Sequence, residues 1–324
     1  MRDVAVIGAG RIGAIHARNL AAMPGVRVAG IADPDAAAAK RLADACRTGV
    51  IPLDSAFSAG AVVIASPTPT HADFVERAAA AGCAAFCEKP IDLDADRVRA
   101  CLAAATRAGI LLMVGFNRRF DPSFAALKET ITAGRIGRLE LLSITSRDPG
   151  PPPAAYIRVS GGLFRDMTIH DFDMARFLLG EEPVALTATA SALLPEVREE
   201  GDVDTAAITL RTASGTIATI TNSRRATYGY DQRIEALGST AMIAAGNHTA
   251  TSLTLADSHG YRTDPALPFF LERYEAAYRA EIATFLAALE GQDVAFPTGE
   301  DGLRALVIAD AALESSRTGN EVSL

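Results

Sequence analysis

The sequence contains no tryptophan, and aromatic residues make up only 6% of its 324 positions. This excludes large stacking platforms for bases or sugar rings and predicts cores built from Ala, Val, Ile and Leu. Basic residues are also in deficit, with 31 Lys and Arg against 39 Asp and Glu and a net charge of -8. Because such a surface repels a phosphate backbone, nucleic acid is not an expected partner.

Cysteines are few, and no long apolar run is present. Cys46, Cys83, Cys87 and Cys101 form no C-x-x-C pair, and no His/Cys cluster lies near enough in sequence to complete a zinc site. They are expected to be free thiols in a reducing cytoplasm. No segment approaches the roughly 18 apolar residues of a membrane span, and the N-terminus lacks a signal-peptide pattern. The sequence therefore predicts a cytoplasmic protein without a membrane segment.

The length suggests two domains at about 150 residues each, and the pattern places their boundary near residue 120. In residues 1–120, short apolar runs without polar alternation are separated by segments of helical length. The runs that predict buried parallel strands are 4–7, 26–31, 62–65, 84–87 and 111–116, with helices near 11–23, 35–45, 70–81 and 94–108. A further strand is expected within 48–60, where a proline interrupts the pattern. This α/β rhythm predicts a doubly wound Rossmann sheet with its ligand crevice at the carboxyl ends of the strands.

Residues 121–324 change to period-two alternation separated by turn signals, which indicates a mainly antiparallel sheet with one open face. The expected strands are 139–146, 184–191, 203–211, 216–222 and 232–237, and the expected helices are near 122–133, 163–179, 270–290 and 300–317. The prolines in 148–153 predict stiff extended backbone. The second domain is therefore an α+β domain suited to substrate binding and self-association.

The first expected strand runs into a G-x-G-x-x-G motif that opens a helix. Its residues are Gly8, Ala9, Gly10, Arg11, Ile12 and Gly13. Glycines there permit a tight turn, close approach to a pyrophosphate and close helix packing, and the helix N-terminus offers N–H groups to the anion. Asp33 follows at the end of the second strand, where a carboxylate can bind a ribose hydroxyl and repel a 2′-phosphate. NAD is therefore expected rather than NADP, the alternative being a glycine-rich turn without a ligand.

Two more loops leave the same edge of the predicted sheet. In the first, the hydroxyls of Ser66 and Thr68, with Pro67 between them, can meet ribose or nicotinamide, and His71 begins the next helix. His71 either contacts the cofactor or is a polar residue of the first turn that faces solvent or caps the helix. The second loop carries Glu88 and Lys89; either the ammonium group is used in function, or the two residues form a surface pair.

These motifs in this order, G-x-G-x-x-G, S-P-T-x-x-H and E-K-P, resemble the Gfo/Idh/MocA family of oxidoreductases along essentially the whole chain. The stretch 161–173 resembles the G-G-x-x-x-D-x-x-x-H-D-x-D active-site segment of the inositol 2-dehydrogenase branch. Segments 115–121, 146–149 and 228–233 also look like that branch. The resemblance implies a homotetramer that binds NAD and a cyclic polyol, with Lys89 donating to the reacting oxygen.

Asp166 and His170 lie four residues apart in a helical segment, so their side chains share a face and can hydrogen-bond. The carboxylate would fix the imidazole tautomer and make His170 a better general base. The pair could instead be purely structural, or could join Asp171 and Asp173 around a metal. No metal is expected, because Asp171 and Asp173 cannot both share that face and nicotinamide chemistry needs none.

Further substrate contacts are expected from residues in the segments that carry the resemblance. They are Asn117, Asp148, Asp173 and Tyr230. For Tyr230, packing in the core is the alternative, and Tyr228 is its nearest rival. Arg118 and Arg119 are read as solvated or paired with acidic helices.

Together the residues predict NAD-dependent oxidation of a secondary ring hydroxyl, with myo-inositol converted to scyllo-inosose (2-keto-myo-inositol) and His170 as the base. Another inositol isomer or derivative, or an aldose sugar, stays open as the substrate because stereochemistry is set by pocket shape. A dinucleotide-sensing regulator without catalysis is the alternative of another class. That class predicts an incomplete constellation, whereas Lys89, Asp166 and His170 are all present.

Overall fold

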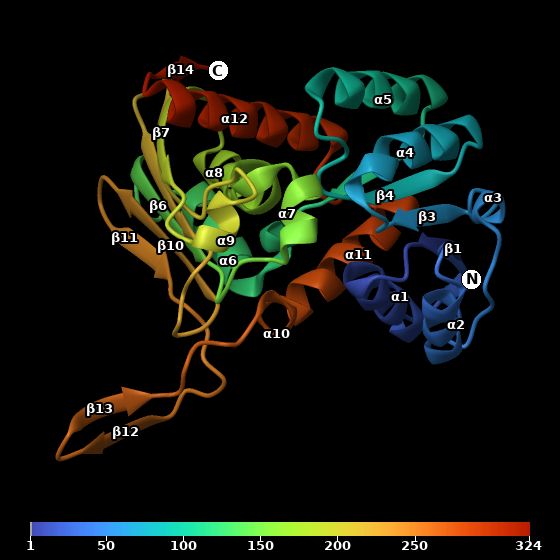
Figure 1. Cartoon of the computed structure of the whole chain (residues 1–324), viewed down its shortest axis with the longest axis horizontal. Helices are drawn as coiled ribbons and strands as arrows, with labels where there is room; N and C mark the ends of the chain where they lie inside the picture. Colours follow the sequence, from blue (N-terminus) through green and yellow to red (C-terminus); the bar gives the residue numbers. More distant parts are fainter. Residues whose placement is uncertain (1) are drawn as a thin grey trace. The chain divides into compact units, whose positions relative to one another are not determined.

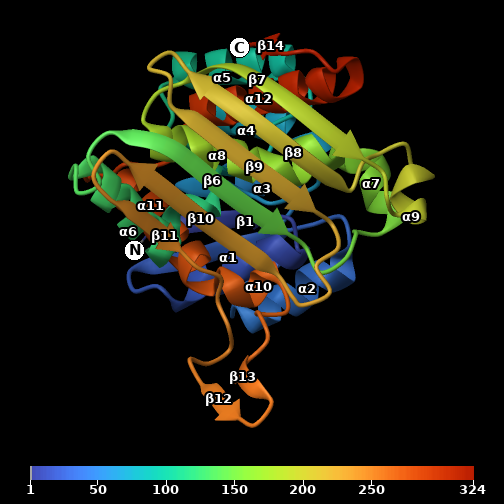
Figure 2. The same ribbon diagram turned by 90° about the vertical axis from the view of Figure 1, so that its left-hand side faces the viewer.

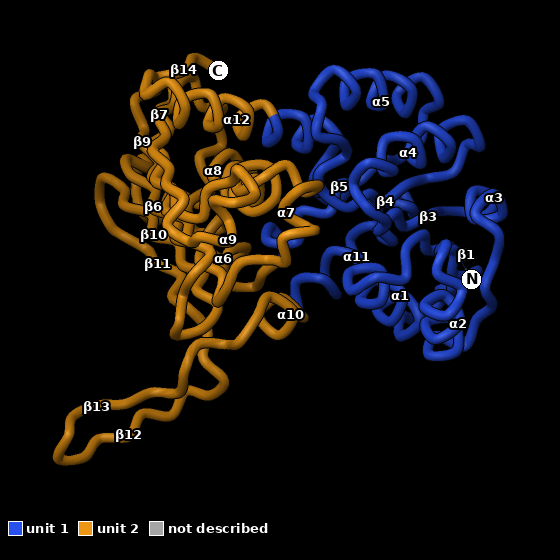
Figure 3. The backbone as a smooth tube through the Cα atoms, viewed as in Figure 1, with its two compact units in different colours: residues 1–120, 276–306 blue, residues 121–275, 307–324 orange. Residues whose placement is uncertain are grey.

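The computed structural model describes residues 2–324, which form two compact units (Figure 3). The first unit comprises the chain up to Phe120 together with residues 276–306. The second comprises residues 121–275 and 307–324. Residues 276–306, which the sequence pattern assigns to the second domain, thus pack within the first unit.

The first unit contains the expected doubly wound parallel sheet. Its strands are β1 (Arg2–Ile7), β2 (Val26–Ala32), β3 (Ala61–Ile64), β4 (Ala84–Glu88) and β5 (Leu112–Gly115). Every neighbouring pair is parallel, and the order is β2-β1-β3-β4-β5. All four residues of β3 are buried, as expected of a strand covered on both faces. The predicted Rossmann architecture is therefore confirmed.

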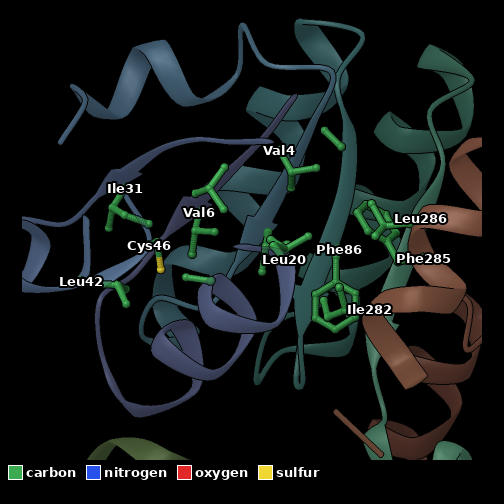
Figure 4. Close-up of a cluster of buried hydrophobic side chains, with 14 of the residues drawn as sticks. Val4, Val6, Leu20, Ile31, Leu42, Cys46, Phe86, Ile282, Phe285 and Leu286 are labelled. Carbon is green, nitrogen blue, oxygen red and sulfur yellow. The ribbon is translucent and has the colours of Figure 1, made fainter. Parts of the chain in front are cut away.

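Helices cover both faces of this sheet (Figure 1). On one face lie α1 (Arg11–Ala22), α2 (Ala36–Ala45) and α11 (Glu275–Leu289), and on the other lie α4 (His71–Ala80) and α5 (Ala95–Ala108). Figure 4 shows the core on the first face, where Leu20 of α1 and Phe285 of α11 pack with Val4, Val6 and Phe86 of the sheet. Residues 276–306 belong to the first unit because α11 completes this core.

The predicted strand within 48–60 is wrong. That segment holds the four-residue helix α3 (Leu53–Ala56) instead of a strand. It meets the sheet through an isolated bridge between Ile31 and Val50 and through the Thr48 hydroxyl, which donates to the carbonyl of Val28 at 2.7 Å. Pro52 stands at the N-cap of α3 with φ -58°, and a proline has no N–H to donate to a strand ladder.

The second unit is built on a seven-stranded sheet. Its strands are β6 (Leu139–Arg147), β7 (Pro183–Ser191), β8 (Thr205–Thr212), β9 (Ile217–Ser223), β10 (Asp231–Gly238), β11 (Met242–Ala245) and β14 (Val322–Ser323). The order is β11-β10-β6-β9-β8-β7-β14, with β6 and β9 parallel and the other neighbours antiparallel. The predicted mainly antiparallel sheet is confirmed.

One face of this sheet is packed and the other is open, as Figure 2 shows. Helices α6 (Pro122–Thr132), α8 (Ile169–Leu179) and the later part of α12 (Gly299–Thr318) cover the packed face. The alternation along β10 illustrates the division, because Ile234 and Ala236 are buried whereas Arg233, Glu235 and Leu237 are exposed. This alternation is the signal that identified the strand from sequence.

Several shorter elements complete the chain. They are α7 (Ala154–Ser160), α9 (Pro195–Arg198), α10 (Phe270–Arg273), the 3-10 turns η1 (Thr68–Thr70) and η2 (Asn117–Phe120), and the π-helical turn η3 (Phe164–Thr168). A hairpin of β12 (Thr254–Asp257) and β13 (Gly260–Thr263) extends away from the second sheet, with every residue exposed. Within residues 2–324, no helix combines the length and apolar character needed to span a membrane.

Candidate functional site

The candidate residues of the first unit lie along a single edge of the parallel sheet. The strand ends are in register, since Ile7 pairs with both Ala32 and Ile64, and Glu88 pairs with Gly115. The residues that follow these ends therefore share the carboxyl edge, where ligands bind in such sheets. They are Gly8, Asp33, Ser66, Lys89 and Asn117.

The glycine loop meets the loop after β3 at this edge. Gly8 has φ +106°, and a Cβ added to it would lie 2.4 Å from the carbonyl oxygen of Ala65. A Cβ on Gly13 would lie 2.0 Å from the carbonyl oxygen of Gly8, whereas one on Gly10 would meet no atom within 4 Å. Gly8 and Gly13 are thus required by the protein itself, and Gly10 leaves open space in front of α1.

The first turn of α1 suits an anion. Gly10 is its N-cap, no side chain caps it, and no acidic residue lies in its first turn. Its N–H groups and the positive end of the helix dipole therefore face the open space at Gly10. Ala9 and Ile12 are partly buried around this position, and Arg11 is exposed. The loop fits the pyrophosphate of a dinucleotide.

The carboxylate of Asp33, which follows β2, is held by two backbone N–H groups. One carboxylate oxygen accepts a hydrogen bond from the backbone N–H of Ala9 at 2.6 Å, and the other accepts from the N–H of Asp35 at 2.8 Å. The carboxylate is therefore fixed beside the glycine loop. An ionised carboxylate has about four lone-pair sites, so both oxygens retain capacity for ribose hydroxyls.

The loop after β3 is held together by its own hydroxyls and by His71. Ser66 Oγ lies 2.7 Å from Thr70 Oγ1, and Thr70 also donates to the carbonyl of Pro67. His71 is only 2% exposed, and the N-cap of α4 makes no side-chain capping bond, so His71 neither faces solvent nor caps the helix. Thr68 begins the 3-10 turn η1 at the same edge. Their contact with a cofactor remains a prediction.

Lys89 directly follows β4, and the Lys89–Pro90 peptide bond is cis. Its neighbour Glu88 turns inward, where one carboxylate oxygen lies 2.6 Å from Nε2 of the fully buried His16. Lys89 itself is partly buried at the carboxyl edge. The residue that precedes Lys89 is therefore anchored in the core, and the Lys89 side chain extends from a backbone held at that point.

Asn117 and its two arginine neighbours follow β5. Asn117 is 3% exposed, and its amide nitrogen has no hydrogen-bond partner within residues 2–324. A buried polar atom of this kind at a ligand edge is suited to bind a hydroxyl or a carbonyl. Arg119 forms an ion pair with Asp301 at 2.9 Å, as expected of a paired arginine, whereas Arg118 is buried rather than solvated.

In the second unit, Asp166 and His170 lie on either side of a helix junction. Asp166 is in the π-helical turn η3, and His170 is the second residue of α8. Asp166 accepts a hydrogen bond from the Tyr156 hydroxyl at 2.9 Å and pairs with Nη2 of Arg224 at 3.3 Å. Single π-turns inside helices are frequent at functional sites. The predicted pairing of Asp166 with His170 remains a prediction.

The helix that carries His170 is fixed to the sheet through the next residue. Asp171 is fully buried and lies 2.5 Å from Ser146 Oγ and 2.8 Å from Asn222 Nδ2. Asn222 in turn accepts from Thr168 at 2.7 Å, so strands β6 and β9 hold both ends of the junction. Asp171 is thereby committed to a structural network, and Asp173 is also buried, at 1% exposure.

The remaining candidates occupy different surroundings. Asp148 follows β6, and its backbone donates to Ser223 and accepts from Ala226. Tyr230 is 4% exposed and packs edge-on against Phe269 and Tyr274. Tyr228 is half exposed, and its hydroxyl donates to Asp231 and accepts from Arg147. Tyr230 therefore packs in an aromatic cluster, as the alternative from the sequence had it, whereas the Tyr228 side chain lies at the surface.

Sequence reasoning missed Arg224 and His16. Arg224 is 1% exposed and lies between Asp166 and Asp202, at 3.3 and 4.0 Å, but nothing in the local pattern distinguishes it from its neighbour Arg225. His16 could have been found, because the buried residues of α1 are Gly13, His16, Ala17 and Leu20. A histidine at such spacing on the inward face of a helix demands a buried partner.

Family models match both halves of the chain. Residues 2–116 match the model described as an oxidoreductase family, NAD-binding Rossmann fold, and residues 124–244 match the GFO/IDH/MocA C-terminal domain. Unit 1 is therefore an NAD-binding Rossmann domain, as the glycine loop predicts.

Individual proteins resemble the chain along its full length. An inositol 2-dehydrogenase of Rhizobium meliloti is 52% identical over 324 residues, which cover 98% of each chain. The crystal structure of a myo-inositol dehydrogenase from Corynebacterium glutamicum is 47% identical, with a TM-score of 0.95 over 100% of this chain and 99% of that one. The structure of a scyllo-inositol dehydrogenase from Lactobacillus casei with NAD(H) and scyllo-inositol is 28% identical, with a TM-score of 0.92 over 100% and 99%.

Proposed function

The chain belongs to the Gfo/Idh/MocA family of oxidoreductases, and we propose that it is an NAD-dependent dehydrogenase acting on myo-inositol. The product is scyllo-inosose, formed by oxidation of the hydroxyl at carbon 2. The observation that carries this proposal is the 52% identity along the whole length of an inositol 2-dehydrogenase. The candidate residues at the carboxyl edge and in the helix junction supply the groups that such a reaction requires.

The glycine loop and Asp33 hold the cofactor. The open space at Gly10 and the first N–H groups of α1 would hold the pyrophosphate. Asp33, fixed by the N–H of Ala9, accepts from the ribose hydroxyls and repels a 2′-phosphate. The remaining members of the loops that line the edge complete the cofactor site. They are Ala9, Arg11, Ile12, Ser66, Pro67, Thr68, His71 and Glu88.

NAD, when bound, accepts the hydride from the substrate carbon. Lys89 donates a hydrogen bond to the reacting oxygen and so stabilises the negative charge that develops there. His170 takes the hydroxyl proton as general base. Asp166 supports the imidazolium that results, and Nη2 of Arg224 lies 3.3 Å from its carboxylate. Asn117, Asp148, Asp173 and Tyr230 bind the other hydroxyl groups of the ring.

Spectrophotometric detection of NADH formation tests the proposal directly. The enzyme is assayed with myo-inositol, scyllo-inositol and glucose, and turnover is expected to be highest with myo-inositol. Highest turnover with scyllo-inositol would favour the second candidate, which the bound ligand of the Lactobacillus casei relative supports. Absence of NADH with every polyol and sugar would refute the dehydrogenase and favour a dinucleotide-sensing regulator.

Single substitutions test the assigned roles. His170→Ala should bind NAD as the unaltered enzyme does and lose turnover by about 10²- to 10⁴-fold, the usual contribution of a general base. His259→Ala is the matched control, because His259 lies in the exposed hairpin turn and should change neither property. Turnover of His170→Ala equal to that of the control would remove His170 from the role of base.

Self-association is proposed through the open face of the second sheet. That face is rich in hydroxyl and apolar side chains, among them Thr187, Thr209, Ile217 and Met242. It also carries a depression of about 410 Å³ between β7, β8 and β9. The family resemblance implies a homotetramer, and light scattering of the purified protein should give four times the chain mass. A monomer by this measurement would reject the assignment.

The cytoplasm is the proposed compartment, because all four cysteines are free and buried thiols. Fractionation of the source cells should recover the chain with cytoplasmic markers. Recovery of oxidised protein from an extracytoplasmic fraction would contradict this location.

A further inference from the structure

Lys89 lies between two residues that are each held by a buried histidine. Glu88, before it, is bonded through its side chain to His16 of α1, and Pro90, after it, is bonded through its carbonyl to His71 of α4. The two helices cover opposite faces of the sheet (Figure 1). The backbone of Lys89 is thus anchored from both faces.

The contact of His16 with Glu88 is largely buried, with the His16 side chain 0% and the Glu88 side chain 13% exposed. Nε2 of His16 is 2.6 Å from Oε1 of Glu88, and the ring packs edge-on against Phe86 at 4.9 Å and Tyr278 at 5.8 Å. On the far side of the carboxylate, a Cβ added to Gly115 would lie 2.9 Å from Oε2 of Glu88. These neighbours restrict the Glu88 carboxylate to the side of His16.

His71 bridges two loops. Its Nδ1 lies 2.8 Å from the carbonyl oxygen of Pro90, and its Nε2 lies 2.7 Å from the carbonyl oxygen of Ser66. The imidazolium donates to both oxygens, whereas the neutral ring can donate to only one. The pKa of His71 is lowered, chiefly by burial and also by the charge of Lys89, and the two carbonyls and the charge of Glu88 oppose this only in part.

We propose that His16 and His71 are positioning residues that fix Lys89 at the reacting oxygen, an inference that rests on the catalytic role proposed for Lys89. A lysine side chain is flexible, so its ammonium group is precise only if its backbone is held. A displacement of about 1 Å at a reacting group can lower turnover by about 10²-fold. Neither histidine needs to touch the substrate to have this effect.

The same cluster has a second reading as a cation site. Glu281 of α11 is fully buried, and one ligand atom from each of His16, Glu88 and Glu281 lies within 4.8 Å of the others. A bound divalent cation would use His16 and Glu88 as ligands instead of leaving them to hold Lys89. Dialysis against EDTA separates the readings, since positioning by hydrogen bonds requires no metal.

The test compares replacements that keep or remove the anchoring bonds. Glutamine can place an amide nitrogen near Nε2 of His16, so His16→Gln should retain turnover within about threefold, whereas His16→Leu should lose at least about tenfold in kcat. One amide nitrogen cannot span two carbonyls, so His71→Gln should recover less of the loss in His71→Leu. In the His16 variants, NAD affinity and the KM for the polyol should change by less than about threefold. The His71 variants are judged by kcat and by backbone exchange, because His71 also belongs to the proposed cofactor site.

Two controls separate positioning from loss of stability. Leu42→Ala removes a buried side chain of the same core on α2 and should lower the melting temperature while kcat is retained. In a Lys89→Ala background, His16→Leu should cause no further loss of kcat, because a positioning residue acts only through Lys89. Additive losses in the double variant, or equal losses in His16→Gln and His16→Leu, would overturn the proposal.

A measurement that does not use turnover distinguishes this inference from the proposed function. Hydrogen–deuterium exchange of residues 86–91 should be faster in His16→Leu and His71→Leu than in Leu42→Ala. If the unaltered protein oxidises no polyol but exchange still rises, the dehydrogenase assignment fails and the anchoring stands. Unchanged exchange, or loss of activity in EDTA that Zn²⁺ restores, would refute the anchoring by hydrogen bonds.

Discussion

Gly10→Ala should leave the fold intact and weaken NAD binding. Gly10 has φ -71° and ψ -170°, which alanine adopts freely, and the added Cβ would meet no protein atom within 4 Å. Alanine is a poorer N-cap than glycine, but it also reduces the freedom of the unfolded chain. The two effects oppose one another, so the free energy of unfolding should change by less than about 1 kcal/mol. The melting temperature should move by less than roughly 4 °C.

The effect on NAD follows from the same empty space. If the pyrophosphate approaches the N-terminus of α1 at Gly10, a methyl group there displaces it from the N–H donors. Each charge-assisted hydrogen bond is worth about 1.5–3 kcal/mol, so loss of one such bond should weaken binding by roughly 10- to 150-fold. Isothermal titration of NAD into the purified protein measures this change directly.

Gly13→Ala in the same motif provides the contrast. The Cβ added at residue 13 would lie 2.0 Å from the carbonyl oxygen of Gly8, and because this oxygen belongs to the backbone, no rotamer change can relieve the clash. This variant should be destabilised by more than about 3 kcal/mol and should bind NAD poorly for that reason. The reasoning is refuted if Gly10→Ala loses as much stability as Gly13→Ala, or if it binds NAD with unchanged affinity.

Three further substitutions or reactions follow from the geometry. Asp33→Asn keeps an oxygen that can accept from the N–H of Ala9 but removes the negative charge. The kcat/KM with NADP, relative to that with NAD, should therefore rise by about tenfold or more. An unaltered ratio would contradict the assignment of Asp33 to the ribose. Arg224→Met leaves Asp166 without its buried counter-charge and should lower the free energy of unfolding by about 3–5 kcal/mol, as measured by chemical denaturation. A loss below about 1 kcal/mol would show that the ion pair contributes little to stability. Burial raises the pKa of Cys83 to about 11 and that of Cys101 to about 12, so both thiols should react with Ellman's reagent at pH 8 only after unfolding, and rapid labelling of native protein would be the opposite result.

The carboxyl edge of the first sheet could be predicted from sequence because two local signals coincide there. Each parallel strand is a short apolar run, and each functional residue follows the end of such a run. Parallel pairing then brings the ends together without any knowledge of side-chain contacts, as the register of Ile7 with Ala32 and Ile64 shows. The same reasoning fails at 48–60, because Pro52 starts a helix where a strand was expected.

Long-range packing accounts for what the sequence did not show. Residues 276–306 follow the second sheet in the chain, yet α11 contributes Ile282 and Phe285 to the core beside Phe86. The sequence of an apolar helix does not indicate which surface of the protein the helix will cover. The hairpin of β12 and β13 was missed for a different reason, since its residues are exposed on both faces and show no alternation.

The helix junction shows how spacing predicts a shared face but leaves other partners unidentified. The four-residue interval between Asp166 and His170 gives no indication of Arg224, which lies 58 positions farther along the chain, or of Tyr156. An ionised carboxylate has about four lone-pair sites, so bonds to Tyr156 and Arg224 do not exhaust those of Asp166. The buried guanidinium therefore has a function that the pair alone cannot supply, since it offsets the cost of placing a charged carboxylate beside the proposed base. Arg224→Lys should therefore retain more turnover than Arg224→Met, because lysine keeps the positive charge even though it lacks the planar geometry of the guanidinium group.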